Sequence, residues 1–406
     1  MAEAILQVVP RLDAGGSEQA AVEIAEALTR AGASALVATE GGRMATTLAD
    51  AGGEIIPLPV ASKNPFTILA NARRLARLVE ERGVALVHAR SRAPGWSAFL
   101  AARRTGRPFV TTYHGAYGDF GPLKSAYNSV MGRGDRVIAN SRYTAHLIAS
   151  RHQAARERIR TIYRGVDEHV FDPSAVKPEA VAKLRERWGV APETKIVLQA
   201  ARLTGLKGHR DTIEAAFLLA TEGALDGAVV IFAGDAPGKS AYRAELAALI
   251  ARHGLADKVR LVGHCEEMQA AFLASQVALV PSLVPETFGR TSVEAQAMGC
   301  PVILSNLGAL PETVVSPEQD KSGFTGWLVP SGDALALAAR IKLALRLNPQ
   351  TRAALGARAR RHVAGKFTLR RMQQATLAVY DELLGTYLAA RFEQRTAPLP
   401  AGILLK

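Results

Sequence analysis

The chain has 406 residues, of which 48% are hydrophobic and 21% charged, and its formal net charge is +13. This length exceeds what one hydrophobic core usually serves, and it predicts a globular protein of two domains. No apolar run approaches the roughly 18 residues of a membrane-spanning helix, and no basic segment precedes the first apolar run, so we expect neither a membrane span nor a signal peptide. The two cysteines, Cys265 and Cys300, fit no zinc-binding spacing, so we expect buried thiols in a reducing compartment.

In the first half of the chain, apolar runs alternate with segments of helical periodicity. This alternation predicts a parallel sheet that is covered by helices on both faces. The expected strands lie near residues 5–9, 35–38, 85–88, 109–113 and 136–139. The expected helices lie near residues 17–30, 65–82 and 94–104.

Two loops of this half stand at the expected ligand edge of the sheet. Gly15-Gly16 joins the first strand to the first helix, and glycines there let backbone approach a phosphate or a hexose closely. The segment lacks the full GxGxxG pattern, so a nicotinamide cofactor is not favoured, and Ser17 could equally serve as a helix cap. His114 ends the strand near 109–113, and the nearby Gly115 and Gly118 favour a loop that faces a cleft over a purely structural histidine.

The second half repeats the alternation of strands and helices. Strands are expected near residues 195–200, 229–233, 259–262, 277–280 and 302–304. The prolines of residues 173–194 indicate a linker before them, and residues 369–388 show the apolar spacing of one long helix. The last stretch, from about Glu393, is expected to fray.

A basic cluster follows the strand near 195–200. Arg202 and Lys207 flank a glycine-containing loop, and a planar guanidinium and a compact ammonium both suit a diphosphate. The alternative is a solvated surface pair, the usual place of arginine and lysine side chains.

An acidic pair follows the strand near 277–280. Glu286 lies in the loop after this strand, and Glu294 lies about one turn into the next helix. The intervening Phe288-Gly289-Arg290-Thr291 would direct backbone N–H groups toward a phosphate. Acids that bind hydroxyls beside amides that bind phosphate suggest a sugar nucleotide at the carboxyl edge of the sheet. The alternative is that these acids only stabilise the helix N-terminus.

Taken together, the motifs resemble glycosyltransferase family 4 over nearly the whole chain. Arg202 with Lys207-Gly208 matches the Arg-x4-Lys-Gly clamp of the family, and Glu286 with Glu294 matches its Glu-x7-Glu element. Further matches occur in the correct order, at Gly15-Gly16, Tyr113-His114-Gly115, Gly165-Val166-Asp167 with Phe171, and the run at 295–302. Arg164, where asparagine is commoner, is one departure, and we interpret that position as structural.

The resemblance implies the α/β fold called GT-B, in which two Rossmann-like domains with parallel sheets face each other across a cleft. It implies an acceptor-side domain (1–172), a linker (173–194), a nucleotide-sugar domain (195–368), a helix that crosses back (369–390) and a tail (391–406). The implied catalytic residues are His114, Arg202, Lys207 and Glu286. The implied donor-binding residues are Gly16, Arg202, Lys207, Gly263, Glu286, Phe288, Gly289, Arg290, Thr291 and Glu294.

By the same resemblance, His114 would contact the transferred sugar, Glu294 the ribose and Glu286 the hexose. The family retains the anomeric configuration. No Asp-x-Asp motif occurs in the chain, so we expect no metal and no other cofactor, and Arg202, Lys207 and the helix after Gly289 would stabilise the departing UDP or GDP. The alternative functions are a sugar-nucleotide epimerase and a non-enzymatic nucleotide-binding protein.

The positive charge is spread over both halves and has three interpretations. One is attraction to an anionic membrane face, where a lipid-linked acceptor or a cell-envelope saccharide such as lipopolysaccharide core would lie. The basic helix near 65–82, with apolar residues interleaved, could bind such a surface. The others are a solvated surface and nucleic-acid binding, and no nucleic-acid module is visible. We expect the protein in the cytoplasm, either free or peripheral at the inner membrane face.

Overall fold

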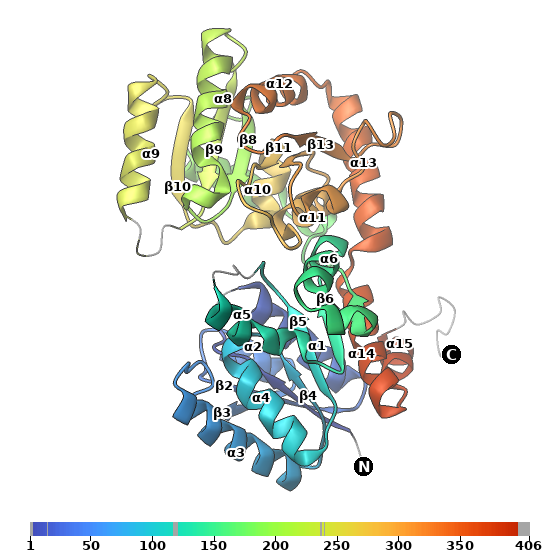
Figure 1. The fold of residues 1–406 in the computed structure, drawn as a ribbon. Helices are drawn as coiled ribbons and strands as arrows, with labels where there is room; N and C mark the ends of the chain where they lie inside the picture. The colour runs from blue at the N-terminus through green and yellow to red at the C-terminus, as the bar shows by residue number, and fades with distance from the viewer. Residues whose placement is uncertain (1–2, 14, 117–120, 236–237, 239, 397–406) are drawn as a thin grey trace, which may run out of the picture. The chain divides into compact units, whose positions relative to one another are not determined.

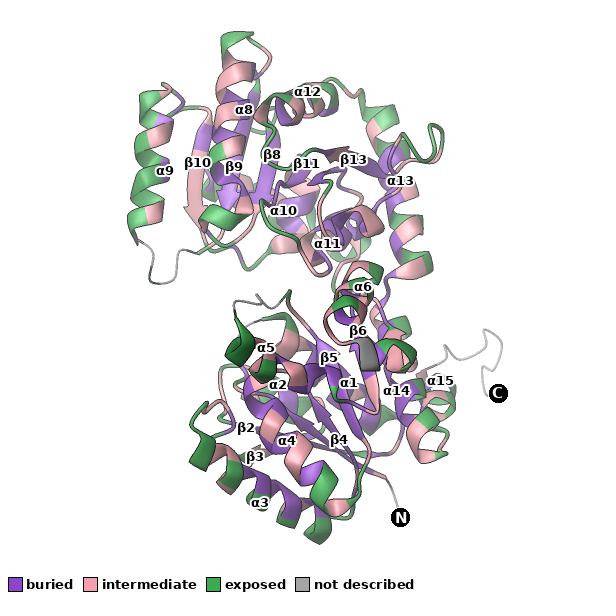
Figure 2. Ribbon diagram, in the orientation of Figure 1, coloured by how far each residue is buried: buried purple, intermediate pink, exposed green. Residues whose placement is uncertain are grey.

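The chain folds into two compact units in the computed structural model, which describes residues 3–13, 15–116, 121–235, 238 and 240–396 (Figure 1). The first unit combines Met1–Tyr163 with Leu369–Lys406, and the second unit is Arg164–Thr368. In both units the central strands are buried, whereas the outer sides of the helices are exposed (Figure 2).

Within its described residues, the first unit contains a seven-stranded parallel sheet in the order β3-β2-β1-β4-β5-β6-β7. The chain order reverses between β1 and β4, and ligands of open α/β sheets bind at the carboxyl ends of the strands at such a point. The strands are β1 (Ala4–Val8), β2 (Ser34–Thr39), β3 (Gly53–Pro57), β4 (Val84–Ala89), β5 (Phe109–Tyr113), β6 (Arg136–Ala139) and β7 (Ile159–Thr161).

Helices cover both faces of this sheet, because successive strand residues point to opposite faces and both sets are apolar. Ile5 of β1 packs in the cluster beneath α1, α14 and α15, while Leu6 packs in the cluster beneath α3 and α4. The helices are α1 (Gly16–Arg30), α2 (Ala45–Asp50), α3 (Pro65–Glu81), α4 (Arg92–Thr105), α5 (Pro122–Asn128), α6 (Arg142–Arg151), α14 (Leu369–Leu384) and α15 (Leu388–Thr396).

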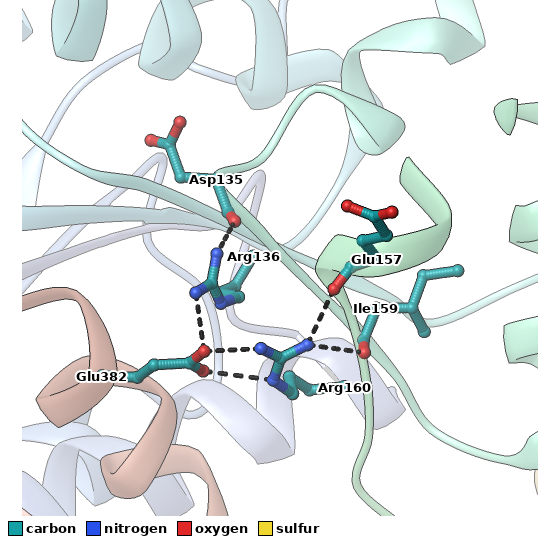
Figure 3. A network of polar contacts seen from close by, with 6 residues as sticks. All are labelled: Asp135, Arg136, Glu157, Ile159, Arg160 and Glu382. Atoms are coloured by element: carbon teal, nitrogen blue, oxygen red, sulfur yellow. Dashed lines mark hydrogen bonds and ion pairs between the residues drawn. The ribbon is translucent and has the colours of Figure 1, made fainter. Parts of the chain in front are cut away.

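Ion pairs join α14 to β6 and β7, the last two strands of the first sheet (Figure 3). The carboxylate of Glu382 accepts hydrogen bonds from Arg136 of β6 (2.6 Å) and from Nε of Arg160 of β7 (3.1 Å). These two guanidinium groups lower the pKa of Glu382 to about 2. In the interior, the hydroxyl of Tyr380 lies 2.7 Å from Nδ1 of His88, so the same helix also contacts the middle of the sheet.

The second unit contains, in its described part, a six-stranded parallel sheet in the order β10-β9-β8-β11-β12-β13. Here the chain order reverses between β8 and β11, which places their following loops at the expected ligand-binding point. The strands are β8 (Lys195–Ala200), β9 (Ala228–Ala233), β10 (Val259–Gly263), β11 (Ser275–Val280), β12 (Val302–Ser305) and β13 (Gly326–Val329).

Two apolar layers enclose this second sheet. One layer lies beneath α8 and α12, and the other lies beneath α7, α10 and α11. The helices are α7 (Pro178–Arg187), α8 (His209–Thr221), α9 (Ser240–Arg252), α10 (Met268–Ala274), α11 (Arg290–Ala297), α12 (Ala334–Leu345) and α13 (Pro349–Lys366). The free cysteines Cys265 and Cys300 are both buried, as expected.

The predicted fold class is confirmed, and every predicted strand is present within one or two residues of its expected ends. Three strands were not predicted: β3, β7 and β13. The long helix expected over 369–388 is instead two helices, because Gly385 adopts a positive φ of 66° between α14 and α15. Residues 391–396 are therefore helical, and the rest of the expected tail lies outside the described residues.

The structure also moves the expected domain boundary. Residues 164–172, assigned to the first domain, and the expected linker 173–194 both belong to the second unit. The N–H of Val166 donates to the carbonyl oxygen of Phe367 (2.8 Å), and α7 packs against α10 within that unit. In the part of the chain that is described, we find no helix whose length and hydropathy would let it span a bilayer.

Candidate active site

The loop after β8 is held rigidly against the loop after β11. Gly208 has a φ of 72°, and a Cβ atom at this position would lie 2.0 Å from the carbonyl oxygen of Pro281. Only glycine allows so close an approach. The buried side chain of Gln199 donates to the carbonyl oxygen of Lys207 (2.7 Å) and accepts from the hydroxyl of Thr212 (2.7 Å). The turn that carries Lys207 is thus fixed from both sides.

Lys207 and Glu286 form an ion pair across these two loops, between Nζ and Oε1. The hydroxyl of the buried residue Ser282 donates to the same carboxylate oxygen over 2.6 Å. The two charged side chains remain 26% and 21% exposed, so a ligand can reach them. The backbone of Glu286 is fixed as well, because its carbonyl oxygen accepts from the N–H of Ala309 (2.9 Å).

The helix α11 begins directly after this loop and carries the second acid. Its N-cap is Gly289, with a φ of 102°, and a Cβ atom there would lie 2.4 Å from Cδ2 of Leu310. Glycine has no side chain to cap the first N–H groups, so this helix end keeps its partial positive charge. Arg290 is the first residue of the helix, and its Nε donates a hydrogen bond to Oε1 of Glu294, one turn further along (2.7 Å). Thr291, partly exposed, lies in the same first turn.

Three other predicted donor-binding residues of the second unit differ in their surroundings. Arg202 is exposed after β8 and makes no ion pair with the described residues. Gly263 ends β10 with a φ of 77°, and its carbonyl oxygen accepts from the N–H of Gly234 (2.7 Å). The ring of Phe288 is buried edge-on against Phe367 with centroids 5.7 Å apart, so only its backbone can contact a ligand.

The two remaining predicted site residues, Gly16 and His114, belong to the first unit. Gly16 is exposed at the start of α1, and His114 is half-buried directly after β5. Because the sheet is parallel, both lie at its carboxyl edge. The hydroxyl of Ser17 donates to Glu18 (2.7 Å) and does not cap the helix, whose N-cap is Gly15. Gly118, expected in the loop after His114, lies outside the described residues.

The structure therefore brings Lys207 and Glu286 into contact and pairs Arg290 with Glu294, all at the reversal point of the second sheet. Cationic groups and helix N–H groups can bind phosphate there, and carboxylates can accept hydrogen bonds from hydroxyl groups. The neighbouring His209 adds no charge, because burial lowers its pKa to about 4. Ser282 and Gln199 are supporting residues that sequence reasoning missed. The only sign of these two residues in the sequence is a polar side chain within an otherwise apolar segment.

Comparisons with known proteins show the family to which this chain belongs. Residues 14–170 match the profile of Glycosyltransferase Family 4, and residues 181–362 match that of Glycosyl transferases group 1. A D-inositol 3-phosphate glycosyltransferase from Mycobacterium marinum is 30% identical, over 78% of this chain and 67% of its own length. A second protein of this name from Catenulispora acidiphila is 32% identical, over 73% and 71% respectively.

Solved structures show the same fold. A glycosyltransferase from Rickettsia africae is 32% identical, with a TM-score of 0.86 over 95% of this chain and all of its own. The HepE protein of Anabaena, solved with UDP-glucose, has a TM-score of 0.79 at 24% identity, over 94% of this chain and 100% of its own. Two doubly wound parallel sheets of this kind define the GT-B class of glycosyltransferases. The chain belongs to glycosyltransferase family 4 and is a hexosyltransferase. These matches do not support the alternatives of an epimerase or a non-enzymatic nucleotide-binding protein.

Proposed function

We propose that the enzyme transfers a sugar from a UDP or GDP donor to a cell-envelope saccharide or lipid-linked acceptor, such as lipopolysaccharide core, with retention of configuration. The observation that carries this proposal is the Lys207–Glu286 pair at the reversal point of the second sheet. It supplies a cation for the diphosphate and an acid for the sugar hydroxyls, on two loops that meet closely at Gly208.

The second unit binds the donor in this proposal. Arg202, Lys207 and the N-terminus of α11 hold the diphosphate, with backbone N–H groups of Phe288, Gly289, Arg290 and Thr291 contributing. Glu294 accepts hydrogen bonds from the ribose, Glu286 orients the hexose, and the backbone near Gly263 contacts the base. The acceptor binds to the first unit near Gly16 and His114.

In the reaction, the bond between the anomeric carbon and the diphosphate oxygen breaks, and its electron pair leaves with the nucleotide. The acceptor hydroxyl forms the new bond, and its proton passes to the departing diphosphate. Fixed positive groups that face this oxygen stabilise the negative charge that develops on it. We assign this role to protein groups and not to a metal ion, because the chain lacks the Asp-x-Asp pair that commonly holds one.

The relatives favour a second candidate acceptor. Two proteins that are 30% and 32% identical are named D-inositol 3-phosphate glycosyltransferases, so a phosphorylated cyclitol is an alternative to an envelope saccharide. We place the reaction in the cytoplasm, free or at the inner membrane face, and the two free, buried cysteines suit that reducing compartment. No nucleic-acid partner is proposed.

A panel of UDP- and GDP-sugars tests the proposal, with nucleotide release measured alone, with D-inositol 3-phosphate and with lipopolysaccharide core acceptors. We expect one donor to be turned over, and turnover to rise with one acceptor class. A product with inverted configuration, or activity that requires a divalent metal ion, would contradict the stated mechanism. No release from any donor would contradict the function itself.

A further inference from the structure

The outer side of α3 exposes large apolar side chains at its amino-terminal end. Phe66 is 83% exposed and Leu69 is 49% exposed, although both belong to a well-anchored helix. The cap residue Asn64 accepts hydrogen bonds from the backbone N–H groups of Phe66 (2.9 Å) and Thr67 (3.3 Å). On the inner side, Asn71 donates to the carbonyl oxygen of Pro59 (2.8 Å). The direction of the two apolar side chains is therefore set by the fold.

Arginines continue this outer side of α3. Arg73 and Arg77 follow Phe66 at helical spacing, so all three lie on one side of the helix, and Arg74 lies beside them. All three arginines are exposed and form no ion pair with described residues. By contrast, Arg82, directly after the helix, is neutralised by Glu54 at 2.6 Å. The middle of the helix, from Arg73 to Arg77, thus carries positive charge that no ion pair with described residues offsets.

A second element exposes an apolar side chain at the same edge of the first unit. Leu123, in the first turn of α5, is 88% exposed. Because all strands of this sheet are parallel, α3 after β3 and α5 after β5 both begin at its carboxyl edge. Gly16 and His114, to which we assign the acceptor, lie at this edge too. Single exposed apolar residues are common, but three at one edge, with unpaired arginines further along the outer side of α3, indicate a surface for binding.

We infer that this edge docks on an anionic lipid bilayer, an inference that rests on the proposed transfer to a lipid-linked acceptor. Phe66, Leu69 and Leu123 insert at the boundary between headgroups and acyl chains, while the three arginines of α3 contact the lipid phosphates. The acids of the helix, Glu80 and Glu81, lie in its last turn, after the arginines. Docking in this way brings a membrane-held acceptor to the edge where Gly16 and His114 lie.

Sedimentation with vesicles tests this surface in the absence of any donor or acceptor. The 406-residue chain is expected to bind vesicles that contain phosphatidylglycerol, and to bind pure phosphatidylcholine vesicles far more weakly. The double variant Phe66→Ser with Leu69→Ser should weaken binding about tenfold or more, because it removes two large apolar groups from the interface. Arg73→Gln with Arg77→Gln should weaken it by roughly fivefold for each charge removed, and added salt should reduce the difference.

Matched control variants separate this surface from a general effect of charge or apolar exposure. Leu335 of α12 is 71% exposed in the second unit, and Leu335→Ser should leave vesicle binding unchanged. Arg104 and Arg107, exposed at the end of α4 and therefore at the opposite edge of the first sheet, provide the charge control as a double glutamine variant.

Two results would overturn the inference: no binding of the wild-type chain to phosphatidylglycerol vesicles, or equal loss in the control and surface variants. A variant that changes the oligomeric state in gel filtration but not vesicle binding would assign the surface to a second copy of the chain instead. Nucleotide release from the donor sugar is measured in parallel without vesicles. If release persists while vesicle binding is absent, the inference fails and the proposed function stands.

Discussion

The carboxyl edges of the two sheets differ in how deeply their charged side chains are buried. In the second unit, charged side chains pair with one another at the edge itself, as Lys207 does with Glu286 and Arg290 with Glu294. In the first unit, the ion pair that follows β1, between Arg11 and Asp13, is more exposed to solvent, and Glu382 of α14 forms further ion pairs with the sheet. The charged pairs of the second edge are thus partly buried and held in place, as a site for a highly charged ligand requires. The first edge carries glycine backbone, a histidine and exposed apolar groups beside a solvent-exposed ion pair.

The largest expected effect is on the charged pair of the second unit. Lys207→Ala and Glu286→Ala should each fold, and each should lose on the order of 10² in transfer rate or more, because each removes a preorganised group from the reacting centre. Lys342 forms a comparable exposed ion pair with Glu222 in the same unit, so Lys342→Ala is the matched control. Wild-type rates in both site variants would show that the assignment of the site is wrong.

The second effect concerns the glycine that lets the two loops touch. Gly208→Ala places a Cβ atom against the carbonyl oxygen of Pro281 and strains the positive φ, so we expect a loss of about 2 kcal/mol or more in the free energy of unfolding. Gly254 has a similar φ of 65°, but a Cβ atom there would meet no other atom within 4 Å, so Gly254→Ala should show the backbone cost alone, about 1 kcal/mol. Equal losses in urea denaturation would contradict the close contact.

A smaller effect is expected at Ser282, whose hydroxyl donates a hydrogen bond to the carboxylate of Glu286. Ser282→Ala removes one hydrogen bond to a carboxylate, worth about 1.5 kcal/mol, and should lower kcat about tenfold. Urea denaturation of the variant should show a smaller relative effect, because the fold does not depend on this one hydrogen bond. A loss of stability with a wild-type rate would mean that Ser282 only stabilises the fold.

The smallest effect belongs to the first unit and its ion pairs with α14. The pKa of Glu382 is held at about 2, below its value in the unfolded chain, so its stabilising contribution is present above about pH 5. That contribution is lost as the pH falls toward 2. Because the carboxylate is 34% exposed, Glu382→Gln should cost only about 0.5–1 kcal/mol at neutral pH. Thermal unfolding of wild type and variant should converge as the pH is lowered, and a constant difference would contradict the ion-pair account.

Buried strands of the fold could be predicted from sequence, whereas three edge strands could not. The predicted central strands are continuous apolar runs, because parallel strands are covered on both faces. The strands β3, β7 and β13 each lie at the edge of a sheet. The strand β7 has only three residues, all partly exposed or exposed, and β3 ends in a proline. Such segments carry little periodic signal, since one side of the strand lacks a neighbour.

The region of the candidate site could be predicted from sequence, but its contacts could not. Loops that follow neighbouring parallel strands meet at one edge, which is why Arg202, Lys207, Glu286 and Glu294 could be assigned to one region. The ion pair of Lys207 with Glu286 spans 79 residues, and no local pattern specifies it. The inward direction of the Phe288 ring depends on Phe367, which follows a helix distant in sequence. The boundary near Tyr163 likewise depends on backbone pairing between Val166 and Thr368.

Calorimetric titration of the protein with UDP, GDP and NAD, on wild type and on Lys207→Ala, tests the central claim that the second unit binds a nucleoside diphosphate through its charged edge. We predict that UDP or GDP binds to the wild type, that the variant binds the same nucleotide at least about tenfold more weakly, and that NAD does not bind. Binding of NAD alone, or equal affinity of wild type and variant for UDP and GDP, would contradict the account.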